Sequence, residues 1–221
     1  SPAGYRPTAW MPNSKHLLVA ETAGPDDVKT LLLDTETGSY RPVDLDEENP
    51  CITNLSAVSP EKGFTLGVSD CVKGDHLNLV SVEMKVRYGH PQTRDIPWDV
   101  TDLAPSADST TVAFVVNENG ASKLYALQWM EDRWRRKSYD VLPTGVVESM
   151  AMDGAGEKLA LSLSAFGAGD RLITVDMASG QVQSWSGPPV GDDAPAPPAS
   201  LVAYPTFDMV DEAPREIPAV M

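Results

Sequence analysis

The fold is decided by a segment of twelve residues, which runs Ala-Pro-Ser-Ala-Asp-Ser-Thr-Thr-Val-Ala-Phe-Val from Ala104 to Val115. A small residue that ends one strand is followed by a polar turn, and an apolar run then begins at Thr111. Ser, Pro, Asp, Asn and Gly favour turns, whereas a fully apolar run suits a strand that is buried on both faces. The segment therefore predicts two consecutive strands of a buried antiparallel sheet.

This pattern occurs four times with a nearly constant period. Three of its copies contain Ala57, Ala104 and Ala151, which are 47 residues apart, and in the first copy Trp10 precedes Ala57 by 47 residues. A fixed period of this size indicates a repeat architecture in which each unit covers the apolar face of the next.

Two further strands complete each repeat. The third strand is predicted at 124–129 in one copy and 172–177 in another, and a more polar fourth strand follows a Gly-containing turn, as at 181–185. Four antiparallel strands in about 40 to 50 residues are typical of a β-propeller blade. We therefore predict an all-β chain, a β-propeller fragment of four four-stranded blades, at about 4–50, 51–100, 101–148 and 149–186.

The last part of the chain departs from the repeat. Residues 187–200 are rich in proline and are interpreted as a linker. Residues 201–208 and 216–221 look like two strands around a charged turn, which predicts a β-hairpin at 201–221. Because the sequence stops at Met221 within an apolar strand, we expect the chain to be truncated there.

Composition narrows the classes of partner. The formal net charge is −15, which argues against nucleic acid, because phosphate binding requires clustered Lys and Arg. The one basic run, 133–137, is interpreted as the solvated edge of a hairpin. No stretch has the roughly 18 consecutive apolar residues of a membrane span, so we expect a soluble protein that does not enter a membrane. The bacterial cytoplasm and the periplasm both remain open.

The cysteines and histidines do not suggest a metal site. His16, His76 and His90 lie far apart and show no metal-ligand spacing to Cys51 and Cys71, so we expect neither a metal nor a cofactor. The two cysteines are too few for a disulfide framework, and the sequence leaves open whether they form a single bridge.

The repeat and the tail together resemble a known family. The stretch Ala-Phe-Val-Val-Asn-Glu-Asn-Gly at 113–120, followed by Lys-Leu-Tyr at 123–125, resembles the blade repeat of TolB-like proteins and of prolyl oligopeptidase propellers. Tyr-Pro-Thr-Phe-Asp at 204–208 and Arg-Glu-Ile-Pro-Ala-Val at 215–220 are similar to the hairpin that opens the α/β-hydrolase domain of prolyl oligopeptidase-family serine peptidases, a group that includes dipeptidyl and acylaminoacyl peptidases. The resemblance implies a propeller of seven or eight blades that precedes a hydrolase domain carrying Ser, Asp and His. Residues 201–221 would then begin a hydrolase domain that is absent from this chain.

The sequence also departs from that family. It has no Gly-x-Ser-x-Gly elbow, and Ser162, Ser164 and Ser186 fall in predicted blade strands and turns. None of the histidines matches the family's base, so we assign no catalytic residue and expect no enzyme activity from this chain alone. Relatives with aminopeptidase activity bind the peptide amino group through acidic propeller residues. The acidic loops offer candidates at Asp26-Asp27, Asp46-Glu47-Glu48 and Asp70, although solvated loops explain them better, and the substrate-binding residues stay unknown.

Two functions follow from these observations. The first is a non-catalytic propeller region that gates the access of a peptide substrate to the missing hydrolase domain. The second is a stand-alone TolB-like or WD-like propeller that acts as a protein-interaction module. A carbohydrate-acting propeller enzyme would need clustered carboxylates, which the sequence does not bring together. In either case a run of four blades leaves two apolar end faces, so we expect the fragment to self-associate through them or to cover them with its tail.

Overall fold

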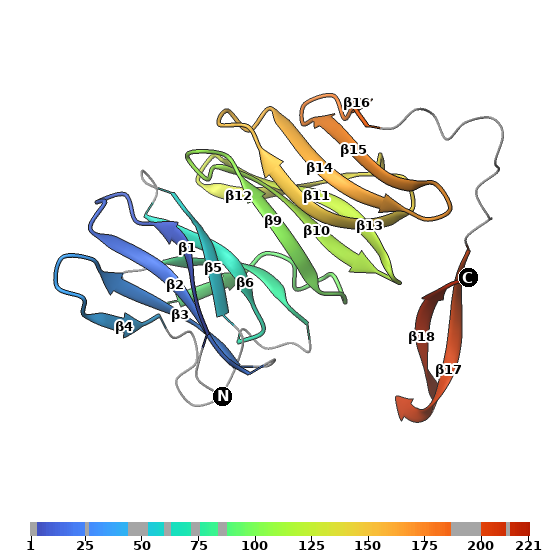
Figure 1. Ribbon diagram of the computed structural model, residues 1–221, viewed down its shortest axis with the longest axis horizontal. Coiled ribbons are helices and arrows are strands. Elements are labelled where there is room, and N and C mark those ends of the chain that lie inside the picture. Colours follow the sequence, from blue (N-terminus) through green and yellow to red (C-terminus); the bar gives the residue numbers. More distant parts are fainter. Residues whose placement is uncertain are drawn as a thin grey trace.

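Four antiparallel sheets of four strands follow one another along the chain, as the repeat predicts (Figure 1). The computed structural model describes residues 4–24, 27–43, 53–59, 63–71, 76–83, 88–186, 200–210 and 213–221. These residues form strands and turns and contain no helix, which confirms the all-β propeller fragment.

Each sheet has its strands in sequence order. Blade 1 contains β1 (Gly4–Trp10), β2 (His16–Gly24), β3 (Asp27–Asp34) and β4 (Tyr40–Pro42). Blade 2 contains β5 (Thr53–Val58), β6 (Phe64–Ser69), β7 (Asn78–Glu83) and β8 (Tyr88–Pro91). Blade 3 contains β9 (Val100–Pro105), β10 (Thr111–Glu118), β11 (Ala121–Met130) and β12 (Arg133–Tyr139). Blade 4 contains β13 (Gly145–Met152), β14 (Lys158–Ala165), β15 (Gly169–Asp176) and β16 (Val182–Ser184).

Each blade has two stacking faces, which the boundary between blades 3 and 4 illustrates. Leu159, Leu161 and Leu163 alternate along β14 and are buried on the side of blade 4 that packs on blade 3. They meet Ala113 and Val115 of β10 in one hydrophobic cluster. We call the side of a blade that meets the preceding blade its leading face, and the side that meets the following blade its trailing face.

The same arrangement holds the other blades together. Val112, Phe114 and Val116 of β10 are fully buried on the leading face of blade 3, where Phe114 shares a cluster with Leu79 of blade 2. Leu18 of blade 1 packs in turn with buried residues of blade 2, among them Val80. Both faces of each inner blade are therefore apolar, which explains the Val-, Leu- and Ala-rich central strands.

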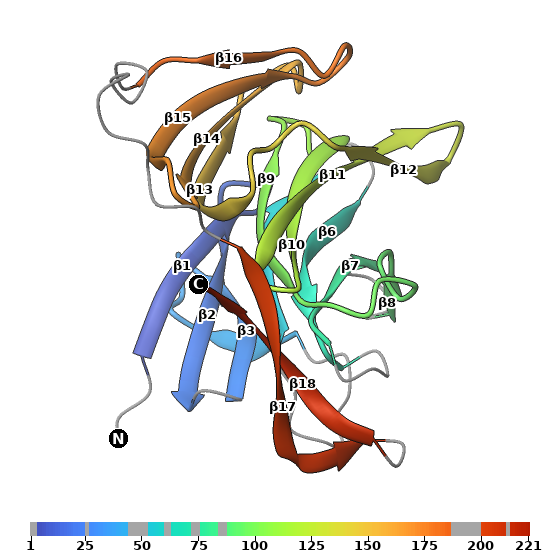
Figure 2. The same cartoon turned by 90° about the vertical axis from the view of Figure 1, so that its right-hand side faces the viewer.

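The first strands of the blades line one side of the arc, with β1 beside β5 and β9 beside β13 (Figure 2). A shift of register interrupts each of these strands where it pairs with the second strand of its blade. The residues at the shifts are Thr8, Ser56, Thr101 and Glu148. Such bulges bend a strand and turn a side chain away from the regular pleat.

The end of the chain forms a separate two-stranded sheet of β17 (Leu201–Val210) and β18 (Ala213–Val220). It pairs with no strand of the described blades, so it lies outside the repeat, as predicted. The predicted linker, 187–200, falls outside the described residues except for Ser200.

Candidate functional site

A cleft of about 1070 Å³ lies between the C-terminal hairpin and one end of blades 2 and 3. The blades contribute His76, Trp98, Asp99, Thr101 and Asn117 to its wall. On the opposite side, β18 contributes residues 214–218, which include Arg215, Glu216 and Ile217. The cleft is the place where the part of the chain outside the repeat meets the propeller.

Backbone hydrogen bonds fix the blade side of this cleft. The N–H of Leu77 donates to Oδ1 of Asp99 over 2.8 Å, and the N–H of Val100 donates to the carbonyl of Leu77 over 2.9 Å. The N–H of Asn117 donates to the carbonyl of Asp99 over 3.1 Å. Residues 98 and 99 are thus held against the ends of β7 and β10 and present a defined surface to the cleft.

The lining of the cleft includes acceptors, on Asp99 and Glu216, and donors, on Trp98 and Arg215. The carboxylate of Asp99 lies 3.7 Å from Nδ1 of His76, and both side chains are about half exposed. Oδ1 of Asn117 is buried, and it has no hydrogen-bond partner among the described residues.

The chemistry of this wall suits binding. Acceptor oxygens and the half-buried Trp98 can hold the N–H groups and apolar side chains of a polypeptide. Nucleophilic catalysis requires a hydroxyl, thiol or amine within hydrogen-bond reach of a base. The hydroxyl in the lining belongs to Thr101, and it donates to the carbonyl of Val115 over 3.5 Å.

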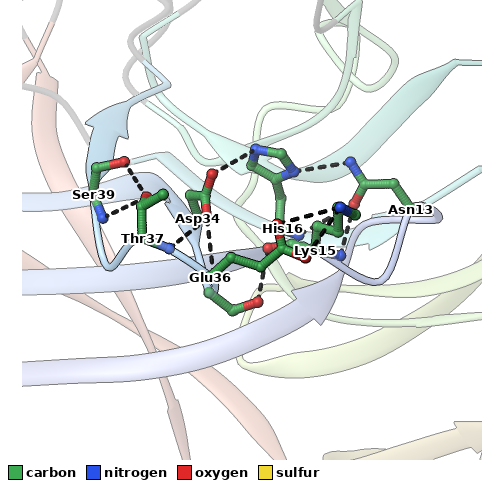
Figure 3. Close-up of polar contacts among 8 residues, drawn as sticks. Asn13, Lys15, His16, Asp34, Glu36, Thr37 and Ser39 are labelled. Atoms are coloured by element: carbon green, nitrogen blue, oxygen red, sulfur yellow. Dashed lines mark hydrogen bonds and ion pairs between the residues drawn. The ribbon is translucent and has the colours of Figure 1, made fainter.

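A second polar cluster connects two turns of blade 1 (Figure 3). Nδ2 of Asn13 donates to Nδ1 of His16 over 2.8 Å, and Nε2 of His16 lies 3.9 Å from the carboxylate of Asp34. Oδ1 of Asp34 accepts the N–H groups of Glu36 and Thr37, each over 2.9 Å.

The same turn recurs in blade 4, where Oδ1 of Asp176 accepts the N–H and the hydroxyl of Ser179. Backbone hydrogen bonds hold the pKa of both aspartates below its usual value. Because these hydrogen bonds repeat at equivalent turns of blades 1 and 4, their role is to stabilise the hairpin turn. In blade 1, His16 lies beside the same aspartate.

The acidic residues singled out in the sequence do not come together in one site. Asp27 lies 3.9 Å from Nζ of Lys29 at the start of β3, and Asp70 follows β6. Asp26 and the group 46–48 lie outside the described residues. Within the described part of the chain, no three His, Cys, Asp or Glu side chains are grouped as a metal ion would need.

The remaining candidates have structural positions. Ser162 and Ser164 lie in β14, where Oγ of Ser162 is 2.9 Å from that of Ser149. Oγ of Ser186 accepts the N–H of Leu172 over 2.6 Å. The basic run forms the outer strand β12, in which Arg136 pairs with Asp95.

His90 lies 3.9 Å from Glu83 in blade 2. Cys71 is disulfide-bonded, and the other cysteine of the sequence, Cys51, lies outside the described residues. In the described residues, no helix is long and apolar enough to cross a membrane.

Sequence reasoning did not find the cleft. Trp98, Asn117 and Arg215 belong to three separate segments, and no repeat position brings them together. The sequence did show that 201–221 departs from the repeat, and this segment forms one wall of the cleft. It gave no indication of the residues of blades 2 and 3 that form the other wall.

Comparison with solved structures supports the fold. The chain resembles a prolyl endopeptidase with a TM-score of 0.73 at 9% identity, over 99% of this chain and 30% of that one. It resembles a puromycin hydrolase with a TM-score of 0.72 at 15% identity, over 98% of this chain and 33% of that one. TolB from Acinetobacter baumannii gives a TM-score of 0.60 at 15% identity, over 99% of this chain and 52% of that one.

These likenesses confirm, at the level of fold, the propeller and TolB resemblance drawn from the sequence. The chain spans about a third to a half of the length of these three solved chains. No family model matches the sequence, and no curated protein does.

Proposed function

We propose that this chain is the non-catalytic propeller region of a serine peptidase of the prolyl oligopeptidase type, and that it gates the access of peptides to a hydrolase domain that follows the hairpin. The observation that carries the proposal is the hairpin of β17 and β18, which pairs with no blade strand and forms one wall of the cleft.

The comparisons favour this function over the stand-alone interaction module. The two enzymes match 98% and 99% of this chain with TM-scores of 0.72 and 0.73. TolB matches a similar share of the chain at the lower score of 0.60.

The cleft supplies a physical basis for gating. Asp99 offers acceptor oxygens to a peptide backbone or amino group, while Trp98 offers an apolar surface. Binding energy gained at such a wall positions a substrate for groups that lie elsewhere.

The first test is the complete coding sequence and its product. We expect a Gly-x-Ser-x-Gly elbow downstream of residue 221, and we expect the full-length protein to react with a fluorophosphonate probe for activated serines. If the full-length protein lacked an activated serine, the proposal would be wrong, and the interaction module would take its place.

Gating itself is tested in the same full-length protein. We expect Trp98→Ala and Asp99→Asn to change KM for peptides by several-fold, while the rate of labelling by the small fluorophosphonate stays unchanged. Glu157→Gln, on an exposed turn of blade 4, is the matched control. Equal effects on peptide and probe would contradict gating, because a gate acts only on substrates that touch it.

A further inference from the structure

The outer edge of blade 3 differs from the outer edges of the other three blades. Its outer strand β12 has seven residues, whereas β4, β8 and β16 have three or four. β4 and β8 also end in prolines, Pro42 and Pro91, which cannot donate to a further strand. β12 contains no proline, and its register with β11 runs without a shift. Propellers normally leave only short edges, so blade 3 is unusual in having a long, regular edge that can accept another strand.

This edge does not result from where the row of blades stops. Blade 3 lies between blades 2 and 4, and the order of its sheet places β12 farthest from its first strand β9. Figure 2 shows β12 at the periphery of the arc, away from β9. The neighbouring blades stack on the two faces of blade 3, and they therefore leave its outer edge open.

The hydrogen-bond pattern shows which backbone groups of this edge are open. A two-residue turn joins β11 to β12, and Arg133 is the first residue of β12 to pair. In such a hairpin the closing pair exchanges two backbone hydrogen bonds, and hydrogen-bonded pairs then occur at every second residue. The residues between them, Trp134, Arg136 and Ser138, direct their N–H and C=O groups away from β11. No hydrogen bond within the described residues occupies these backbone groups.

Cationic side chains are concentrated on the same edge. Four of the 17 lysine and arginine residues of the chain occur within 133–137, although the formal net charge is −15. Because side chains alternate along a strand, Arg133, Arg135 and Lys137 lie on one side of β12. This is the side that faces blade 4, where Lys137 contacts the turn after β15. The three residues therefore form a row of positive charges along the open edge.

The row is only partly neutralised within the described residues. Nη2 of Arg133 and Nη2 of Arg135 lie 3.5 Å and 2.7 Å from the same atom, Oε2 of Glu131. The two arginine side chains are 63% and 46% exposed. Nζ of Lys137 donates to two carbonyl oxygens of blade 4 over 3.2 Å and 3.1 Å, and these acceptors carry no charge. Three cations thus share the one carboxylate that these contacts supply.

The other side of β12 is packed and neutral. The ring of Trp134 lies 4.9 Å from the ring of Phe64 in blade 2, in an edge-to-face arrangement. Arg136 is paired with Asp95, which precedes blade 3 in the chain. A strand that added to β12 would therefore meet a row of cations on one side and an aromatic ring on the other.

We propose that the outer edge of blade 3 binds an extended acidic segment of a partner protein, which adds to β12 as a fifth strand. The backbone of this segment pairs with the three outward-facing residues of β12, and carboxylates at alternate positions lie beside Arg133, Arg135 and Lys137. The residues that line the cleft do not include any of β12. The proposal is therefore independent of the proposed peptidase function.

Charge decides between the occupants of this edge. A second copy that paired through its own β12 would place like charges side by side, which is unfavourable in a sheet. Nucleic acid cannot continue a ladder of peptide hydrogen bonds, and a chain with a net charge of −15 repels a polyanion. An acidic strand satisfies both the open backbone groups and the row of cations.

Fluorescence anisotropy with the full-length protein tests the proposal through two labelled peptides of equal composition, each as long as β12. In one peptide glutamate alternates with threonine, and in the other all the glutamates precede the threonines. We expect the alternating peptide to bind about tenfold more tightly, because only it can place each carboxylate beside a cation while its backbone pairs with β12. Equal affinities, absence of binding, or equally tight binding of a short duplex DNA would overturn the proposal.

Amide hydrogen exchange locates the bound peptide. The N–H groups of Trp134, Arg136 and Ser138 should exchange rapidly in the free protein, because they have no acceptor in the sheet. With the alternating peptide at saturation, we expect all three to become protected. Binding that leaves the exchange of these three groups unchanged would contradict strand addition.

Variants separate strand addition from general electrostatic attraction. Arg135→Glu should weaken binding of the alternating peptide about tenfold or more, because it replaces an attraction by a repulsion. Arg41→Glu makes the same change of charge on β4, the exposed outer strand of blade 1, and should bind like the wild type. Equal losses in these two variants would overturn the assignment to β12.

A third variant tests the backbone contribution alone. Ser138→Pro removes one outward N–H group, retains every cation and breaks no hydrogen bond to β11. We expect it to weaken binding several-fold, with circular dichroism establishing that all variants are folded. Wild-type affinity of folded Ser138→Pro would show that charge alone attracts the peptide and would overturn strand addition.

Discussion

The substitution of leucine by alanine at two equivalent positions tests how the blades are held together. Leu159 and Leu17 occupy the same register in blades 4 and 1, each opposite the third strand of its blade. Leu159 is fully buried in the cluster that joins blades 3 and 4, whereas Leu17 is only partly buried on the uncovered leading face. The same chemical change should therefore have different costs.

The magnitude follows from the atoms removed. Leucine to alanine removes the equivalent of three methylenes, which at about 0.8 kcal/mol each amounts to roughly 2.4 kcal/mol. The cavity left at a fully buried site brings the total for Leu159→Ala to about 3 kcal/mol or more. Leu17→Ala leaves no enclosed cavity, and we expect a loss of about 1 kcal/mol.

Thermal unfolding measures the difference. For a chain of this size 1 kcal/mol corresponds to about 2–4 °C, so Leu159→Ala should lower Tm by about 6–12 °C and Leu17→Ala by about 2–4 °C. Urea denaturation followed by tryptophan fluorescence gives the free energies directly. Equal losses at the two sites would refute the stacking of blade 4 on blade 3.

Three further outcomes are expected. Gly67→Ala should lower the midpoint of thermal unfolding far more than Gly38→Ala. A Cβ at Gly67 would lie 2.1 Å from the backbone oxygen of Asn54, whereas a Cβ at Gly38 would lie in open space and would only be strained by the φ of +74°. Acid should lower Tm below about pH 4, because hydrogen bonds from the turns lower the folded-state pKa of Asp34, Asp108, Asp153 and Asp176. The stability that these aspartates contribute is present above their unfolded pKa of about 4 and is lost as the pH falls through their folded-state pKa values. A Tm that stays unchanged down to pH 2 would contradict this prediction. At Asp102 burial has the opposite effect, because it raises the pKa of the carboxyl group and disfavours the charged form. Calorimetry should therefore show that Asp102→Asn is more stable than the wild type at pH 7 and has no such advantage at pH 3.

The repeat made most of the fold predictable. Turn residues followed by an apolar run, as from Ser106 to Val116, recur at a fixed spacing, and strands of this type can bury both faces only by stacking. The shifts of register in the first strands could not be predicted, because Thr8 and Glu148 share no sequence signal and the bulge arises from how the strand bends within its blade.

The site was less accessible to sequence reasoning. A cleft depends on where segments far apart in the chain meet, and Trp98 and Asn117 are unremarkable in their local sequence. The acidic loops were visible, but charge alone does not show what a side chain contacts: Asp27 faces Lys29, and Asp34 holds a turn.

Oxidative footprinting of aromatic side chains tests the central claim, that the blades stack by one repeated boundary, most directly. We predict that Tyr139 is protected while Tyr40 and Trp185 are modified rapidly, in accordance with their exposures of 5%, 65% and 60%. Modification of Tyr139 at the rate of Trp185 would contradict the stacking of blades 3 and 4 and, with it, the repeated boundary.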